Sequence, residues 1–159
     1  MHLLHVFMVH NSKFIYFMLS GLLTIYILAL LYVTLLPDFW AGGILEMDPT
    51  TPRPLIKLIP FDTLIESFQL GLMTFLIQVG GNILLLFPLG LMSGGLKKGW
   101  LWVALVSFLI EISQLLLSLQ LGFVYRTFDV DDLWMNTLGG LLGYLVARKV
   151  WYNRRNNKA

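Results

Sequence analysis

The chain has 159 residues, of which 57% are hydrophobic and 13% are charged, and its formal net charge is +2. This composition excludes an ordinary soluble globular domain, and the absence of cysteine excludes disulfides, thiolate catalysis, zinc–thiolate sites and iron–sulfur clusters. The apolar residues are grouped into long runs, a pattern that is typical of membrane-spanning helices.

The first predicted span covers residues 14–36, which contain no charged residue. A helix rises ~1.5 Å per residue, so this run is long enough to cross the ~30 Å hydrocarbon core of a bilayer. The run is too long for the apolar part of a signal peptide, and no clear cleavage site follows it. We therefore expect it to stay in the protein as the first span.

The longest connection, residues 37–71, contains more acidic than basic residues. Its first part is kept extended by four prolines, namely Pro49, Pro52, Pro54 and Pro60. Thr63 and Glu66 have the spacing of a capping box, which predicts a short helix that begins near Asp62. The apolar residues of this helix predict that it lies on the membrane surface as an amphipathic interfacial helix.

The second predicted span covers residues 72–93 and has Asn82 near its middle, and Lys97 and Lys98 form a basic turn after it. The third span covers residues 100–121. Its polar residues recur at spacings of three and four and therefore share one helix face, which comprises Ser107, Glu111, Gln114 and Ser118. Because lipid cannot hydrogen-bond such a face, we expect it to point at other helices.

The fourth predicted span covers residues 132–151, where Arg148 and Lys149 are expected to reach back to the head groups. Gly139 and Gly143 have the GxxxG spacing that lets two helices approach closely. The predicted fold is all-α, with four spans and the short interfacial helix in a single membrane domain over residues 1–159.

The distribution of basic residues predicts the orientation of the four spans. Lys97 and Lys98 mark the middle turn, and the C-terminal tail is also basic, so both chain ends and this turn are expected in the cytoplasm. The acidic first loop and the loop before the fourth span then lie outside. We therefore predict a multi-pass protein of the cell membrane that has no nucleic-acid partner, because its basic residues serve as topology markers.

Glu111 is the foremost candidate for a functional residue, since a carboxylate in the middle of a span is costly unless it is neutralised or paired. Counting residues along each helix places Asn82, Gln114 and Asn136 with it in the outer half of the membrane. The adjoining loop adds Arg126, Asp129, Asp131 and Asp132. The sequence thus predicts an outward-facing polar site between helices.

Each of these residues also has a purely structural interpretation. Asp131 and Asp132 would stabilise the N-terminus of the fourth helix, and Asp129 would be a turn residue. Asn82 and Asn136 would hold helices together, and Arg126 would form a structural ion pair with Glu111. The sequence leaves both interpretations open.

Several short motifs follow one another over most of the chain after residue 58, namely Ile59-Pro60-Phe61, Gly81-Asn82-Ile83, Phe87-Pro88-Leu89-Gly90, Ile110-Glu111-Ile112-Ser113-Gln114, Arg126, Phe128-Asp129-Val130-Asp131-Asp132 and Asn136-Thr137-Leu138-Gly139. In this ordered set the chain resembles the VanZ family, small bacterial membrane proteins associated with teicoplanin resistance. The resemblance implies a multi-pass envelope protein linked to glycopeptide tolerance. It marks Asn82, Pro88, Glu111, Gln114, Arg126, Asp129, Asp132 and Asn136 as motif positions, and it supplies no established reaction.

Two functions follow most directly. In the first, the outward pocket binds a lipid or glycolipid head group, or a glycopeptide, through Asn82, Gln114, Arg126 and Asn136 together with the acidic residues. In the second, the protein is a membrane-embedded enzyme acting on a lipid-linked envelope substrate, with Glu111 as general acid or base and Asp129 and Asp132 as further catalytic candidates. The aspartates would alternatively hold Mg²⁺ or Ca²⁺; we assign no metal-binding residue and expect no cofactor.

A third function is that of a small transporter or an accessory subunit. Four spans without an internal repeat are few for alternating access unless the protein forms an oligomer. The expected partners are membrane lipids or lipid-linked envelope intermediates, a glycopeptide, and a second copy of the chain.

Overall fold

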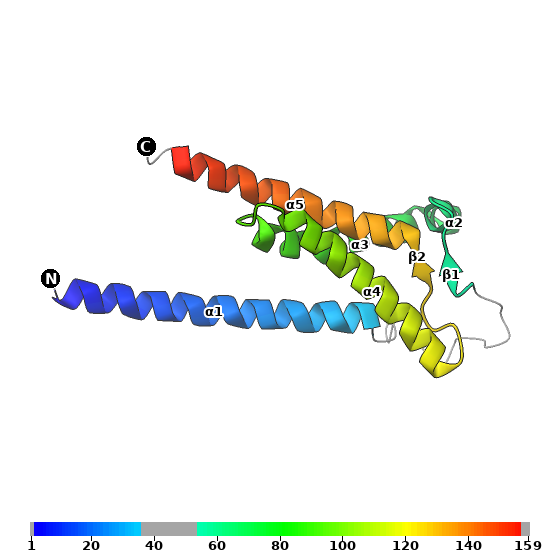
Figure 1. Cartoon of the computed structure of the whole chain (residues 1–159), viewed down its shortest axis with the longest axis horizontal. Coiled ribbons are helices and arrows are strands. Elements are labelled where there is room, and N and C mark those ends of the chain that lie inside the picture. Colours follow the sequence, from blue (N-terminus) through cyan, green and yellow to red (C-terminus); the bar gives the residue numbers. More distant parts are fainter. Residues whose placement is uncertain (1, 36–53, 157–159) are drawn as a thin grey trace. The chain divides into compact units, whose positions relative to one another are not determined.

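The computed structural model describes residues 2–35 and 54–156, which are mostly helical (Figure 1). The chain divides into two compact units, Met1–Ile44 and Leu45–Ala159. Residues 37–53 of the predicted first loop, which include Pro49 and Pro52, lie outside the described residues. That residues 1–159 form a single domain stays a prediction.

The first unit contributes one long helix, α1 (His2–Leu35), which begins well before the predicted start of the first span. Ser20, Thr24 and Thr34 each donate their hydroxyl to a backbone carbonyl three or four residues earlier. These hydroxyls therefore have acceptors within the helix itself and need no water.

In the described part of the chain, three helices are long and apolar enough to cross a membrane. They are residues Phe17–Leu35 of α1, α3 (Leu72–Ser93) and α4 (Gly99–Leu121), and they coincide with the first three predicted spans. The last helix, α5 (Val130–Asn156), covers the predicted fourth span, but its apolar run between Asp132 and Arg148 is short and rich in glycine. The fourth span stays a prediction.

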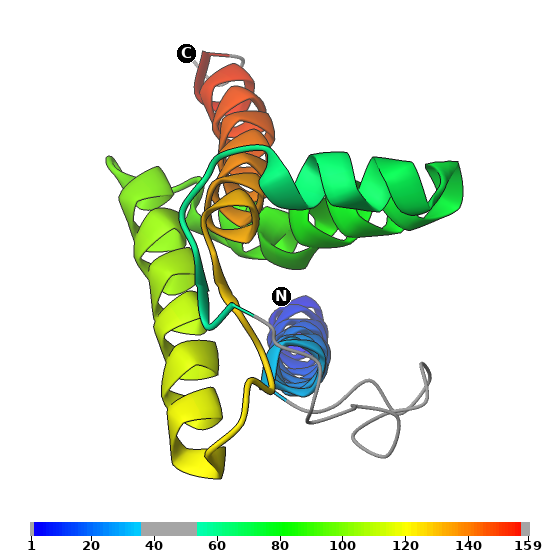
Figure 2. The same ribbon diagram turned by 90° about the vertical axis from the view of Figure 1, so that its right-hand side faces the viewer.

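The second unit is built around α5, which packs on α3 and on α4 (Figure 2). Gly139 lies against the backbone of Ile83, and Gly143 lies against the backbone of Phe87, so α3 and α5 run parallel in direct backbone contact. Gly90 of α3 touches Gly140 in the same way. The predicted packing role of the GxxxG spacing is confirmed, because a Cβ atom at these positions would overlap the neighbouring helix.

The short helix α2 (Asp62–Leu70) begins at the predicted residue and connects through Gly71 to α3. The segment before it contains a two-residue strand, β1 (Ile56–Lys57), which pairs in parallel with β2 (Phe128–Asp129). Phe128 N donates to Leu55 O at 3.0 Å and extends this pairing. Such a short strand pair has no periodic signature, so the sequence predicted none. Its effect is to hold residues 54–59 beside the start of α5.

At the opposite end of the second unit, Tyr144 connects α5 to the turn that precedes α4. Its hydroxyl lies 3.3 and 3.2 Å from the carbonyl oxygens of Leu96 and Lys97, in the turn between α3 and α4. Arg148 donates to the same hydroxyl and lies over the tyrosine ring, 5.7 Å from its centroid. Tyr144 and Arg148 thereby tie α5 to the basic turn.

Candidate functional site

The predicted polar face of α4 is buried in the structure. Ser107, Glu111, Gln114 and Ser118 all lie inside the second unit, whereas most of the apolar residues of α4 are exposed. An exposed apolar surface with a polar interior is the arrangement expected of a helix in lipid. The side chain of Glu111 is only 1% exposed, so it points at protein.

Ser118 brings the following loop back over α4. Gly122 ends the helix in the left-handed conformation, with φ at 75°, and the chain then reverses. Ser118 Oγ accepts the backbone N–H groups of Tyr125 and Arg126 at 3.2 and 2.8 Å, and it donates to Arg126 O at 2.6 Å. This single hydroxyl therefore shapes the loop that carries Arg126 and Asp129.

The loop places the backbone of Asp129 next to the side chain of Glu111. The backbone N–H of Asp129 donates to Glu111 Oε2 at 2.9 Å, so the mid-span carboxylate accepts a backbone donor from β2. Asp129 Oδ1 accepts the N–H of Asp131 at 2.8 Å, and Asp129 Oδ2 accepts the hydroxyl of Thr63 from α2. The half-buried Arg126 adds a positive charge that acts on Glu111.

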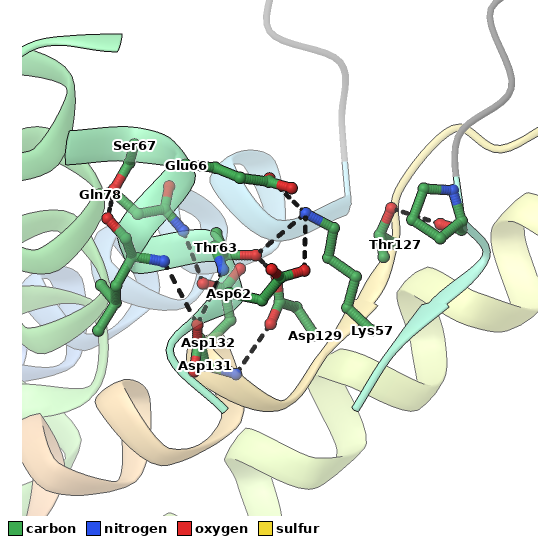
Figure 3. A network of polar contacts seen from close by, with 12 residues as sticks. Lys57, Asp62, Thr63, Glu66, Ser67, Gln78, Thr127, Asp129, Asp131 and Asp132 are labelled. Atoms are coloured by element: carbon green, nitrogen blue, oxygen red, sulfur yellow. Dashed lines mark hydrogen bonds and ion pairs between the residues drawn. The ribbon is translucent and has the colours of Figure 1, made fainter. Parts of the chain in front are cut away.

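Asp131 is fully buried and caps α2, a helix about 70 positions earlier in the sequence (Figure 3). Its two carboxylate oxygens accept the backbone N–H groups of Phe61, Thr63 and Leu64 at 2.7, 3.1 and 3.4 Å. Trp134 Nε1 also donates to it, at 3.0 Å. These contacts satisfy donors at the start of α2 that have no partner inside that helix.

One sequence-based expectation is corrected by this arrangement. Thr63 and Glu66 do not form a capping box, because the N-cap position is Phe61, Thr63 binds Asp129 and Glu66 binds Lys57. Phe61 has a left-handed backbone, with φ at 69°, a conformation that is costly for a bulky residue. The bond from its N–H to Asp131 and the edge contact of its ring with Trp134, 5.8 Å between centroids, hold it in place.

Asp132 joins α5 to α3. Its Oδ1 accepts the side-chain amide of Gln78 at 2.7 Å (Figure 3). The same oxygen accepts the side-chain amide of Asn82 at 2.5 Å. Gln78 was not predicted, although it lies one helical turn before Asn82 on the same face of α3, and this spacing is a signal that would have identified it. A carboxylate with two amide donors is a strong link between helices in a place with little water.

Replacing Asp132 with leucine is expected to destabilise the fold by about 1–3 kcal/mol, because the amides of Gln78 and Asn82 lose their acceptor. Replacing all three residues with leucine is expected to recover most of this loss, since no polar group is then left unpaired. Thermal unfolding in detergent measures both effects. A triple variant that is less stable than Asp132→Leu alone would contradict the link.

Asn136 lies one turn after Asp132 and is also buried between the helices. In the part of the chain that the structure describes, Asn136 Oδ1 is a buried oxygen without a hydrogen-bond partner. Gln114 is likewise buried, on the same face of α4 as Glu111. Of the predicted ligand-binding residues, the structure thus links Asn82 to Asp132 directly and places Gln114 and Asn136 inside the same helix cluster.

A cleft of about 670 Å³ lies at the same end of the unit, between residues 54–59 and α2. It is lined by residues that the sequence-based prediction did not include, namely Pro54, Ile56, Lys57, Leu58, Ile59, Asp62, Glu66, Leu70 and Thr127. Its volume falls within the range typical of small-molecule sites, ~300–1,000 Å³. No signal in the sequence alone would have located it, because the strand pair that shapes it is too short to predict.

Lys57 connects this cleft to the buried carboxylates (Figure 3). Its ammonium group contacts Glu66 directly, lies 3.9 Å from Asp62 Oδ2, and is 3.4 Å from Thr63 Oγ1. Partial burial lowers the pKa of Lys57, but the hydrogen bond and charge of Glu66, with the charges of Asp62 and Asp129, raise this pKa above its ordinary value. A chain of contacts therefore runs from Glu66 through Lys57, Thr63 and Asp129 to Glu111.

Among the described residues, no three acidic or histidine side chains are grouped so that they could hold a metal ion. The aspartates instead serve as hydrogen-bond acceptors between elements that are distant in the sequence. The arrangement is that of a cluster of buried polar groups next to an open cleft.

Comparison with known proteins decides the family. The sequence model of the VanZ/LLP1 family matches residues 23–152, which is most of the chain. The chain belongs to the VanZ family. This VanZ-family protein is a membrane protein, as its three long apolar helices indicate, and the resemblance inferred from its motifs is confirmed. No curated protein and no solved structure matches the chain.

Proposed function

We propose that this VanZ-family protein is a bacterial multi-pass protein of the cell membrane that binds the polar head group of a lipid or lipid-linked envelope component on its outward side. Through this binding it contributes to tolerance of glycopeptides of the teicoplanin type. The observation that carries the proposal is the cleft at one end of the α3–α5 cluster, which is joined by Lys57 and Thr63 to the buried carboxylates below it.

The packing of the helices supports a fourth span. Because α5 runs parallel to α3 and touches it from Gly139 to Ala147, a membrane that is crossed by α3 is crossed by α5 too. The basic turn at Lys97 and Lys98 lies at the end away from the cleft, so the positive-inside rule assigns the cleft to the outer side and both chain ends to the cytoplasm. Exposed Ile65 and Phe68 support an interfacial position for α2.

The burial of Glu111 favours binding over catalysis. A general acid or base has to come within hydrogen-bond reach of its substrate, and the Glu111 side chain is almost completely enclosed. Its carboxyl group still orders Asp129, whose side chain is joined through Thr63 and Lys57 to the lining of the cleft. Glu111 is therefore a positioning residue in this proposal.

We expect Glu111→Gln to make cells more susceptible to teicoplanin, to the level of cells that lack the protein. The glutamine can still accept the Asp129 N–H, but its amide places two N–H donors where the carboxyl group has at most one O–H, and the buried polar cluster has to accommodate them. The measurement is the inhibitory concentration of teicoplanin at matched amounts of protein in the membrane.

Ser113→Ala provides the control, because Ser113 lies on a different face of α4 and donates to Leu109 O of its own helix, at 2.7 Å. This variant is expected to keep the wild-type susceptibility. An unchanged susceptibility in Glu111→Gln, with the protein folded and present at the normal level, would count against the proposed function.

A further inference from the structure

The charged groups that line the cleft are exposed to different degrees. The side chain of Lys57 is 16% exposed, whereas those of Asp62 and Glu66 are 44% and 54% exposed. The ammonium group of Lys57 is turned inward and is shared by Glu66, Asp62 and Thr63. A molecule that enters the cleft therefore meets carboxylates before it meets the lysine.

We propose that this cleft binds the primary ammonium head group of a membrane amphiphile, with Glu66 and Asp62 as its ionic partners. The inference rests on the proposed function and specifies the class of head group for the same outward site. Neither residue was among the ligand-binding positions expected from the sequence.

Charge complementarity selects a cationic group. Two carboxylates and one ammonium line the cleft, and Asp129 lies close behind Lys57 with a further negative charge. An anionic group would need Lys57, whose donors are already directed at Glu66 and Thr63. An ammonium group, in contrast, gains charge-assisted hydrogen bonds to Asp62 and Glu66, whose side chains are partly exposed although each already contacts Lys57.

The apolar part of the lining selects an amphiphile over a soluble amine. Leu58, Ile59 and Leu70 line the cleft and are largely exposed, and they adjoin the exposed apolar residues of α2. An acyl chain would cover these side chains and remove apolar surface from water, while the head group lies at the carboxylates. The cleft is large enough for a head group of this kind.

The test uses the full-length protein in detergent micelles and short-chain phospholipids as probes, with binding measured by calorimetry. Phosphatidylethanolamine carries the primary ammonium group, phosphatidylcholine carries a quaternary ammonium without N–H donors, and phosphatidylglycerol carries neither. We expect phosphatidylethanolamine to bind at least about tenfold more tightly than the other two, because they form no charge-assisted N–H bond. Soluble ethanolamine is expected to bind far more weakly than the lipid.

Glu66→Gln is expected to reduce the affinity for phosphatidylethanolamine by about tenfold or more, and Asp62→Asn is expected to reduce it in the same direction. Gln69→Glu is the matched control, because it adds a carboxylate to α2 at a position outside the cleft lining, and it should leave the affinity unchanged. Thermal unfolding of each variant establishes that it is folded.

Equal binding of the three lipids, or an unchanged affinity in a folded Glu66→Gln protein, would overturn the amine preference and leave the proposed head-group binding in place. If ethanolamine bound as tightly as the lipid, the inference that the ligand is an amphiphile would be overturned. Failure of all three lipids to bind would overturn this inference and leave a lipid-linked envelope component as the ligand of the proposed function.

Discussion

Replacing Gly139 with alanine is expected to lower the stability of the protein by about 3 kcal/mol and Tm by roughly 6–12 °C. The new Cβ would overlap the carbonyl oxygen of Ile83, and a backbone atom of a packed helix cannot move aside as a flexible side chain can. The helices α3 and α5 would have to move apart at this contact, to which Gly90, Gly140 and Gly143 also belong. Thermal unfolding in detergent measures the loss.

Gly81→Ala is the matched control for this substitution. Gly81 lies inside α3, two residues before Ile83, and nothing lies within 4 Å of the position that its Cβ would take. Alanine is the better helix former, so this variant is expected to gain ~0.5–1 kcal/mol. If both variants lost stability to the same extent, the contact at Gly139 would not be the cause.

The second large effect is expected for Asp131→Ala. This change removes the acceptor of three backbone N–H groups at the start of α2 and of Trp134 Nε1, at a cost of about 2–4 kcal/mol. Phe61 would also lose the bond that holds its left-handed backbone. We expect α2 to detach from α5 while α3–α5 stay packed.

Hydrogen exchange of the amides of residues 61–64 and the fluorescence of Trp134 report this detachment. Asp62→Asn serves as control, since Asp62 lies in the first turn of α2 but is partly exposed and is not bonded to those amides; its loss should cost only ~0.3–1 kcal/mol. Protected amides at 61–64 in Asp131→Ala would show that another group caps the helix.

The features that could be predicted from the sequence are those that depend on the residues of a single helix. The polar face from Ser107 to Ser118 follows from the helical period alone, and all four of its members are buried. The glycine spacing of α5 likewise predicts close packing, which the structure confirms against Ile83 and Phe87. Local periodicity is sufficient in both cases because lipid enforces one rule on every span: polar groups face inward.

The partners of the polar groups could not be predicted, because they depend on contacts between distant segments. An aspartate at the start of a helix normally interacts with its own N-terminus, so Asp131 gives no local indication that it caps α2. Thr63 and Glu66 fit a local capping rule and are used elsewhere, by Asp129 and Lys57. The cleft itself depends on residues 54–59 being held beside the loop before α5 by a strand pair two residues long.

The dependence of α3 on α5 has a consequence for the order of events during synthesis. Gln78 and Asn82 enter the bilayer with the second predicted span, yet their acceptor, Asp132, leaves the ribosome some fifty residues later. Until then the two amides are without this acceptor, in a helix that also contains Pro88. The final helix therefore completes the assembly, and a nascent chain that is cut short before it never provides the acceptor of these two amides.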